Sequence, residues 1–315
     1  MKALNCKIKI FLVAFILAGT GLFAQDATKE LHEEFNTNKS TVLNIDSKFC
    51  NLTVNSWDKN KTVIDVTIEV THSDEAAAKK LLKQITVDLE KVGNEIMIKT
   101  NLDDDFSKGV QKIVRKFSIT IVVNAPSYIN LEVDSKFGTA SFGSFSGEAD
   151  FENSFSEIEI EKLSGSKISL ELNQGDLSIG EITNADIDVS FGKLTIMKAG
   201  NISIEVNQGD ASIGSVINLS AEVNMGNLII KHVYPSFETI DIEMNAGNVN
   251  LGVDKDAGFS LEAEMKMGDI DIPHELGKMK KSQSGMNTSF EGKYGNGKSS
   301  ISLEGKLGNI ELKLK

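Results

Sequence analysis

The sequence predicts an all-β protein: a single-stranded β-solenoid of about ten rungs of 17–21 residues, with a small N-terminal cap that contains one helix and a hairpin. Two observations lead to this prediction. The segment ISLELNQGDLSIG (168–180) returns as ISIEVNQGDASIG (202–214), and glycines recur 17 residues apart, at Gly175, Gly192, Gly209 and Gly226. Self-similarity at a fixed period is typical of a stacked repeat architecture.

Each repeat also shows apolar residues at every second position on both sides of its glycine. Around Gly175 these are Leu170, Leu172, Leu177 and Ile179, at positions −5, −3, +2 and +4. Such alternation indicates two short strands with one buried face, and glycine permits a bend between them. A single repeat cannot cover its own apolar face, so its neighbours in the stack must do so.

The same pattern extends over most of the chain. Ser156 and Cys50 occupy the glycine position in two upstream repeats. The predicted turn glycines are Gly138, Gly175, Gly192, Gly209, Gly226, Gly247, Gly268 and Gly308.

Residues 1–24 are predicted to be a secretory signal peptide. Three lysines precede the apolar run IFLVAFILAGTGLFA, which ends at a small residue, Ala24. A retained anchor helix is the alternative, but it needs about 20 apolar residues. The mature chain is therefore expected to be exported and to have no transmembrane span.

Export bounds the redox state and the partners. Only Cys50 remains after cleavage, so no intramolecular disulfide is expected. Cleavage removes three of the 33 basic residues and none of the 45 acids, which lowers the net charge from −12 to −15. So acidic a chain is not expected to bind nucleic acid.

Residues 25–126 are predicted to form the first rung and an α+β cap. A polar lead (25–40) precedes the rung TVLNIDSKFCNLTV; a strand (61–70), a helix (73–85) capped by Ser73 or Asp74, a hairpin (85–100) and a strand (116–126) follow. We expect the Ala/Leu side of the helix to cover the open end of the stack, because an end rung exposes unpaired backbone groups.

Residues 127–315 are predicted to be the solenoid. A Gly-, Ser- and Lys-rich surface excursion (277–300) interrupts it and is expected to be poorly ordered. The last rung is then expected to close the stack, with alternating Lys and Leu blunting its edge.

These features resemble the bacterial putative adhesin family, exported β-solenoid domains of unknown function. The resemblance is carried by rungs in which an acid lies between two apolar residues, three positions before a glycine–Asn/Asp pair, as in LELNQGD and VEVNMGN-like segments such as AEVNMGN (221–227). It implies the fold and, by analogy of name, surface attachment to an unknown envelope protein or polysaccharide. It supplies no catalytic residue.

Enzymatic residue patterns are absent from the sequence. The four histidines, His32, His72, His232 and His274, lack metal-ligand spacing, and no G-x-S-x-G occurs. A polysaccharide-active β-helix enzyme is the alternative, but the acids follow the repeat and Arg115 is the only arginine. Asp103, Asp104 and Asp105 lack a calcium-loop pattern and are interpreted as a solvated turn.

Position −4 is acidic in every aligned rung and is expected to point outward. Two interpretations remain open: a solvated, soluble face, or a working surface that gathers Ca²⁺ weakly or docks a basic partner. No other cofactor is expected. The acids are Asp46, Asp134, Glu152, Glu171, Asp188, Glu205, Glu222, Glu243, Glu264 and Glu304, of which Glu171, Asp188, Glu205, Glu222, Glu243 and Glu264 are weak metal candidates. The sequence thus favours a non-enzymatic binding or scaffold protein in the periplasm, on the cell surface or secreted.

Overall fold

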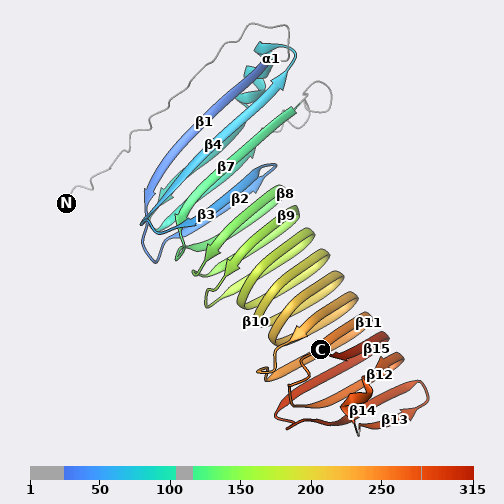
Figure 1. Cartoon of the computed structure of the whole chain (residues 1–315). Helices are drawn as coiled ribbons and strands as arrows, with labels where there is room; N and C mark the ends of the chain where they lie inside the picture. The colour runs from blue at the N-terminus through green and yellow to red at the C-terminus, as the bar shows by residue number, and fades with distance from the viewer. Residues whose placement is uncertain (1–24, 104–115, 278) are drawn as a thin grey trace, which may run out of the picture.

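A computed structural model describes residues 25–103, 116–277 and 279–315. The predicted signal peptide, Asp104, Asp105 and Arg115 lie outside these residues. Within them the protein is nearly all β, with one α-helix, and the strands form a β-solenoid-like coil (Figure 1). The buried apolar residues from Leu43 to Leu312 form one continuous hydrophobic cluster along the coil.

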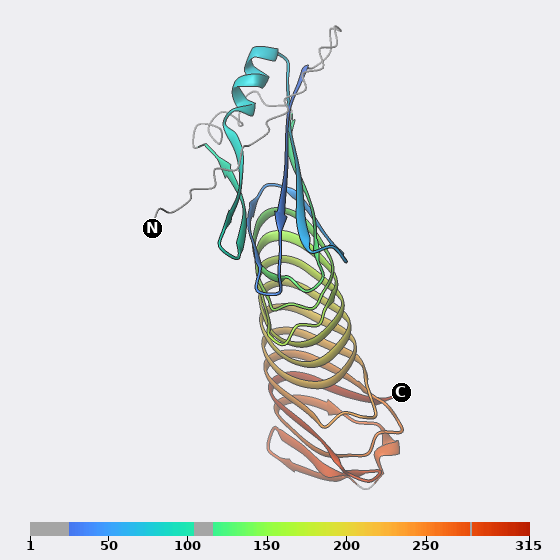
Figure 2. The same ribbon diagram turned by 90° about the vertical axis from the view of Figure 1, so that its left-hand side faces the viewer.

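The middle of the coil is built by successive parallel pairings, and Figure 2 shows its turns edge-on. Gly226 of one turn lies in register with Gly247 of the next, and Leu131 with Ala149. The strands are β8 (Asn130–Phe145), β9 (Ala149–Leu163), β10 (Ile168–Val233) and β11 (Thr239–Val253), of which β10 is a 66-residue strand that winds through several turns.

The alternation in the sequence produces the core. Leu170, Leu172, Leu177 and Ile179, the four apolar positions of one turn, are each at most 2% exposed. Glycine is required at the bend because successive turns approach there closely. At Gly247, with φ of 140°, a Cβ atom would lie 1.8 Å from the carbonyl oxygen of Gly226.

The first turn of the coil consists of β2 (Val42–Lys48) and β3 (Asn51–Trp57), and strands cover both of its edges. On one side β6 pairs with β2, and β5 pairs with β6 as a hairpin. On the other side β7 pairs with β3, and β4 and β1 continue the sheet antiparallel. The bounds are β1 (Gln25–Asn36), β4 (Lys61–His72), β5 (Ile85–Val92), β6 (Glu95–Leu102) and β7 (Lys116–Pro126).

Two expectations about this end were wrong. The polar lead is the long strand β1. The helix α1 (Glu75–Leu82), capped by the Asp74 side chain at 2.9 Å from the Ala76 nitrogen, buries Ala78 and packs mainly on β1 and β4, away from the first turn (Figure 1). Strands meet the unpaired backbone groups of the first turn because only strands offer complementary hydrogen bonds along an edge.

The C-terminal end also differs from expectation. The last strand, β15 (Ser299–Leu314), lies between β11 and β12 (Phe259–Asp271) and pairs in parallel with both. It therefore does not close the stack. A short 3₁₀ turn (His274–Leu276) follows β12.

The predicted surface excursion contains an ordered hairpin. β14 (Asn287–Tyr294) pairs antiparallel with β12, and β13 (Lys280–Ser284) pairs with β14 and ends the sheet. Gly285, with φ of 64°, makes the tight turn, and Phe290 packs against the core cluster. The free edge of β12 orders this segment despite its composition.

Candidate functional site

The acids at position −4 form a row across the coil, because neighbouring strands hold them in register. Asp46 is aligned with Asp134, and Glu222 with Glu243. We call this row the acid ladder. In spatial order it comprises Asp46, Asp134, Glu152, Glu171, Asp188, Glu205, Glu222, Glu243, Glu304 and Glu264, the last two exchanged because β15 lies inside β12.

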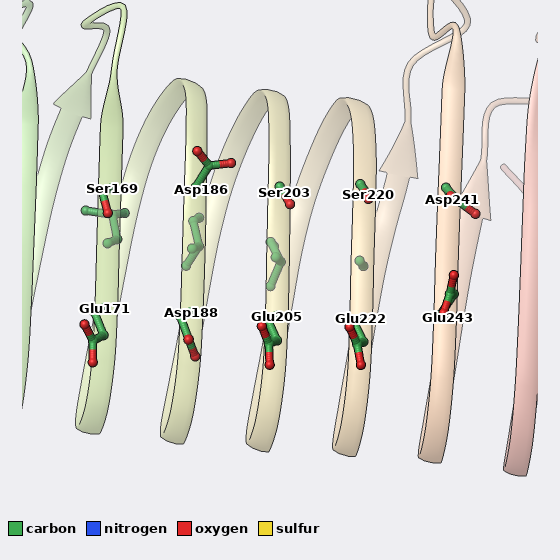
Figure 3. A pocket seen from close by; sticks show the side chains of 14 residues that line it. Ser169, Glu171, Asp186, Asp188, Ser203, Glu205, Ser220, Glu222, Asp241 and Glu243 are labelled. Atoms are coloured by element: carbon green, nitrogen blue, oxygen red, sulfur yellow. The ribbon is translucent and has the colours of Figure 1, made fainter.

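A second outward column runs beside the middle of the ladder. Figure 3 shows Ser169, Asp186, Ser203, Ser220 and Asp241 above the ladder acids of the same turns. Together the two columns line a shallow trough of about 500 Å³ that crosses five successive strand segments. The trough follows from the strand period of two, which sends positions −6 and −4 to the same face.

Lysines neutralise one end of the ladder but not its middle. At Asp46 the ammonium groups of Lys48 and Lys99 lie 3.5 and 3.1 Å from the carboxylate oxygens. Lys136 lies 2.6 Å from Asp134. From Glu171 to Glu243, by contrast, no ladder acid makes an ion pair within the described residues.

Asp188 shows the electrostatic cost of this arrangement. Partial burial raises the pKa of its carboxyl group, and the neighbouring charges of Glu205 and Glu171 raise it further. A hydrogen bond from Asn207 partly offsets these effects. One carboxylate oxygen of Asp188 is buried and has no hydrogen-bond partner. The middle of the ladder is therefore a region of uncompensated negative charge.

The ladder is a row and does not form an ion cage. In the described part of the chain, no group of three or more His, Cys, Asp or Glu side chains is arranged to hold a metal ion. Outward carboxylates on adjacent strands are separated by about the strand spacing of ~4.8 Å. The six weak metal candidates thus present a distributed negative face.

A column of exposed apolar side chains lies at the bend of the turns. Phe49, Phe137 and Phe155 are 46%, 44% and 54% exposed, and their rings stack with centroids 4.9 and 5.0 Å apart. Each has φ between 55° and 57°, a strained conformation for phenylalanine. Sequence reasoning missed this column, although the recurring segments SKFC, SKFG and NSFS carry its signal.

The comparison with protein families decides the kinship of this coil. The sequence matches the Toastrack DUF4097 family over residues 42–313. The chain belongs to this family. The match confirms the resemblance to bacterial putative adhesins, a family of unknown function.

Solved structures similar to this Toastrack protein are distant. A putative adhesin from Parabacteroides distasonis is 13% identical (TM-score 0.42), with 90% of this chain and 97% of that chain covered. A putative adhesin from Bacteroides fragilis is 11% identical (TM-score 0.34; 90% and 97% covered). A putative lipid binding protein from Parabacteroides distasonis is 12% identical (TM-score 0.38; 90% and 96% covered). No curated protein matches the chain.

The remaining candidates of the Toastrack chain are dispersed. Nδ1 of His32 lies 2.6 Å from Asp65 on the exposed face of β1 and β4, His72 is buried beside the start of α1, and His232 lies 3.6 Å from Asp254. Cys50 is free and buried, and burial raises the pKa of its thiol to about 11. These groups are not brought together into one site.

Two further properties complete the site. Among the described residues, no helix has the length and apolarity that crossing a membrane requires. Beside the acid ladder, asparagine side chains link successive turns: Asn224 donates to Asn207 at 2.9 Å and Asn227 to Asp210 at 2.7 Å. Such amide ladders reinforce the register of stacked strands.

Proposed function

We propose that this Toastrack protein is a non-enzymatic binding or scaffold protein, and that the middle of its acid ladder is the surface that binds a basic partner. The observation that carries the proposal is the run of unpaired carboxylates from Glu171 to Glu243 along an open trough.

Physical cost supports a role for this row. Like charges directly opposite each other on adjacent strands destabilise a sheet by a few tenths of a kcal/mol or more per pair. Lysines relieve that repulsion at Asp46 and Asp134, so the fold accommodates them readily. A one-signed face in a concave surface attracts and concentrates opposite charge. The uncompensated middle is therefore suited to a ligand that supplies the missing positive charge.

The chemistry of the trough favours binding over catalysis. Acid–base hydrolysis of glycosides uses two carboxyl groups whose environments differ, one kept protonated and one ionised. The trough instead presents carboxylates in equivalent settings, one per turn. The alternative of a polysaccharide-active β-helix enzyme consequently has less support than a repetitive docking face.

The partner is proposed to be an extended basic segment of an envelope protein or a basic polysaccharide. Its charges would meet carboxylates about 4.8 Å apart, the spacing of neighbouring strands. Weak binding of Ca²⁺ at millimolar levels, with two neighbouring acids sharing an ion, is the second candidate, because carboxylate oxygens are ligands that calcium prefers.

The proposal includes the location and the rung count. The predicted signal peptide supports export to the periplasm, the cell surface or the medium. About ten rungs of 17–21 residues are supported by the ladder itself, since each of its acids belongs to a different turn or terminal strand pair.

A binding experiment with a matched control tests the proposal. The probe is fluorescently labelled oligolysine, titrated at low salt. Replacing Glu171, Glu205 and Glu222 by Gln keeps the shape of the ladder and removes three charges, so we expect affinity to fall at least tenfold. The control replaces Glu157, Glu159 and Glu161, exposed acids outside the ladder, by Gln and should bind nearly as the wild type does.

Thermal melting with and without millimolar Ca²⁺ distinguishes the second candidate. A rise in Tm that the ladder variant loses and the control retains would identify calcium as the ligand. If neither probe binds, and the ladder variant is merely more stable, the acid ladder is a solvated surface and the proposal is wrong.

A further inference from the structure

We propose that copies of this protein associate head to tail, with the open edge of β1 in one copy pairing with the open edge of β13 in the next. The strands form one sheet whose main path runs from β1 to β13. Each of these two strands has a single strand partner within the described residues, β4 and β14 respectively.

Both edges expose backbone groups that can pair. In an antiparallel strand, alternate residues direct their N–H and C=O groups away from the partner strand. An edge of this kind is a template for another strand. All five residues of β13 are exposed, and the outward face of β1 is exposed along most of its length.

The two edges carry opposite charge. β1 contains Asp26, Glu30, Glu33 and Glu34 against Lys29, whereas β13 contains Lys280, Lys281 and no acid. The charges available for a partner are those that have none in the molecule. Lys61 lies 2.8 Å from Glu34, but Glu30 and Glu33 make no ion pair within the described part.

The lysines of β13 are similarly available. Lys280 lies 4.0 Å from Glu291, and the two side chains are 79% and 74% exposed, so water screens this pair strongly. The ammonium group of Lys281 lies over the ring of Phe290, 5.3 Å from its centre, and meets no carboxylate.

Charge complementarity selects the partner. Charged residues commonly protect strand edges from association. Here they disfavour β1 against β1 and β13 against β13, because each of these pairings brings like charges together. Pairing of β1 with β13 brings opposite charges together, so the occupant that fits each edge is the other edge of a second copy.

The shape of the molecule makes such an assembly open-ended. β1 and β13 lie at opposite ends of the long coil, as both ribbon views show (Figures 1 and 2). The two edges of one molecule therefore cannot meet. A repeated head-to-tail contact of this type produces chains unless its rotation closes a ring. β13 has only five residues, so the contact is small and should be weak and salt-sensitive.

Charge reversal on each edge tests the proposal. By analytical ultracentrifugation at low salt, the mass-average mass of the wild-type protein should rise with concentration and return to the monomer value at high salt. The double variant Lys280→Glu, Lys281→Glu should stay monomeric, and so should Glu30→Lys, Glu33→Lys. An equimolar mixture of the two variants should assemble again, because each edge of one variant then complements an edge of the other.

Two controls accompany the measurement. Glu90→Lys changes an exposed acid on β5, the free edge of the side branch, and should leave assembly unchanged. Thermal unfolding establishes that the variants are folded. A wild-type protein that stays monomeric at low salt, assembly that survives in either variant alone, or a mixture of folded variants that stays monomeric overturns the proposal. The ladder variants, whose substitutions lie away from both edges, should assemble as the wild type does.

Discussion

The side-chain amide of Asn309 donates to the side-chain oxygen of Asn248 at 3.0 Å, across 61 residues of sequence. The contact arises because β15 lies between β11 and β12. The last strand of the chain is thus internal in the sheet, with partners on both sides and with Ile301, Leu303, Ile310 and Leu312 buried.

The internal position of β15 predicts slow hydrogen exchange at the C-terminus. Amides that open only with the surrounding sheet exchange at rates set by its stability, whereas those of an exposed edge exchange quickly. By mass spectrometry, peptides covering β15 should be as protected as those covering β11, and those covering β13 should exchange much faster. Equal rates for β15 and β13 would contradict the strand order.

Ile213→Asp should destabilise the protein by several kcal/mol. Ile213 is fully buried, and an aspartate there would be a charge without a partner among apolar side chains. Ser212→Asp adds the same charge at the neighbouring, partly exposed position and should cost much less. Chemical denaturation of both variants measures the difference, and similar midpoints would argue against inward and outward columns.

Gly247→Ala should be more damaging than Gly93→Ala. At Gly93, in the β5–β6 turn, φ is 62° and nothing lies within 4 Å of the added Cβ, so only the conformational cost of about 1–2 kcal/mol is expected. At Gly247 the Cβ would also meet the Gly226 carbonyl oxygen at 1.8 Å, and the adjacent turns must separate. Thermal melting should give the larger decrease in Tm for Gly247→Ala; an equal decrease would show that the turns separate easily.

Asp188→Asn should stabilise the protein at neutral pH. Burial and the adjacent acids raise the pKa of Asp188 in the folded state, so the folded protein holds this proton more tightly than the unfolded chain does. Stability associated with this group is therefore highest below its ordinary pKa and is lost as pH rises through the raised value.

The pH dependence checks that sign. The Tm advantage of Asp188→Asn should be present at pH 7 and shrink as pH falls below the ordinary aspartate pKa of 3.8, where both proteins are uncharged at this position. Asp210→Asn removes an exposed acid outside the acid ladder and serves as the control. A variant that is less stable than the wild type at pH 7 would mean that a favourable partner of Asp188 outweighs the repulsion.

Much of the coil could be predicted because its physics is local. A strand buried on one face must alternate, and close contact of stacked turns must favour glycine, so Leu170 or Gly247 can be assigned from sequence. The order of the strands is different. Every turn presents the same apolar pattern, so β15 fits beside β11 as well as beside β12, and nothing local to residues 299–314 specifies that it lies between them.

Other features were missed for equally physical reasons. β1 has apolar residues only at Ala27, Leu31 and Phe35, four apart, because charged Lys29 and Glu33 share its inner face. That spacing does not resemble a strand. The phenylalanine column lies at the bend, between the two alternating segments, where a rule for inward and outward residues does not apply. The row of acids follows from register, but its lack of lysine partners in the middle requires the three-dimensional neighbours.

The stacked turns also bear on how such a protein can change in evolution. The strongest internal similarity, between the segments that begin at Ile168 and Ile202, joins units two turns apart. Duplication or loss of such a unit inside β10 would restore every contact between neighbouring turns and leave the strands at both ends unaltered. A gene lineage can therefore vary the length of the coil, and with it the number of carboxylates offered to a partner, in whole steps without redesigning either terminus.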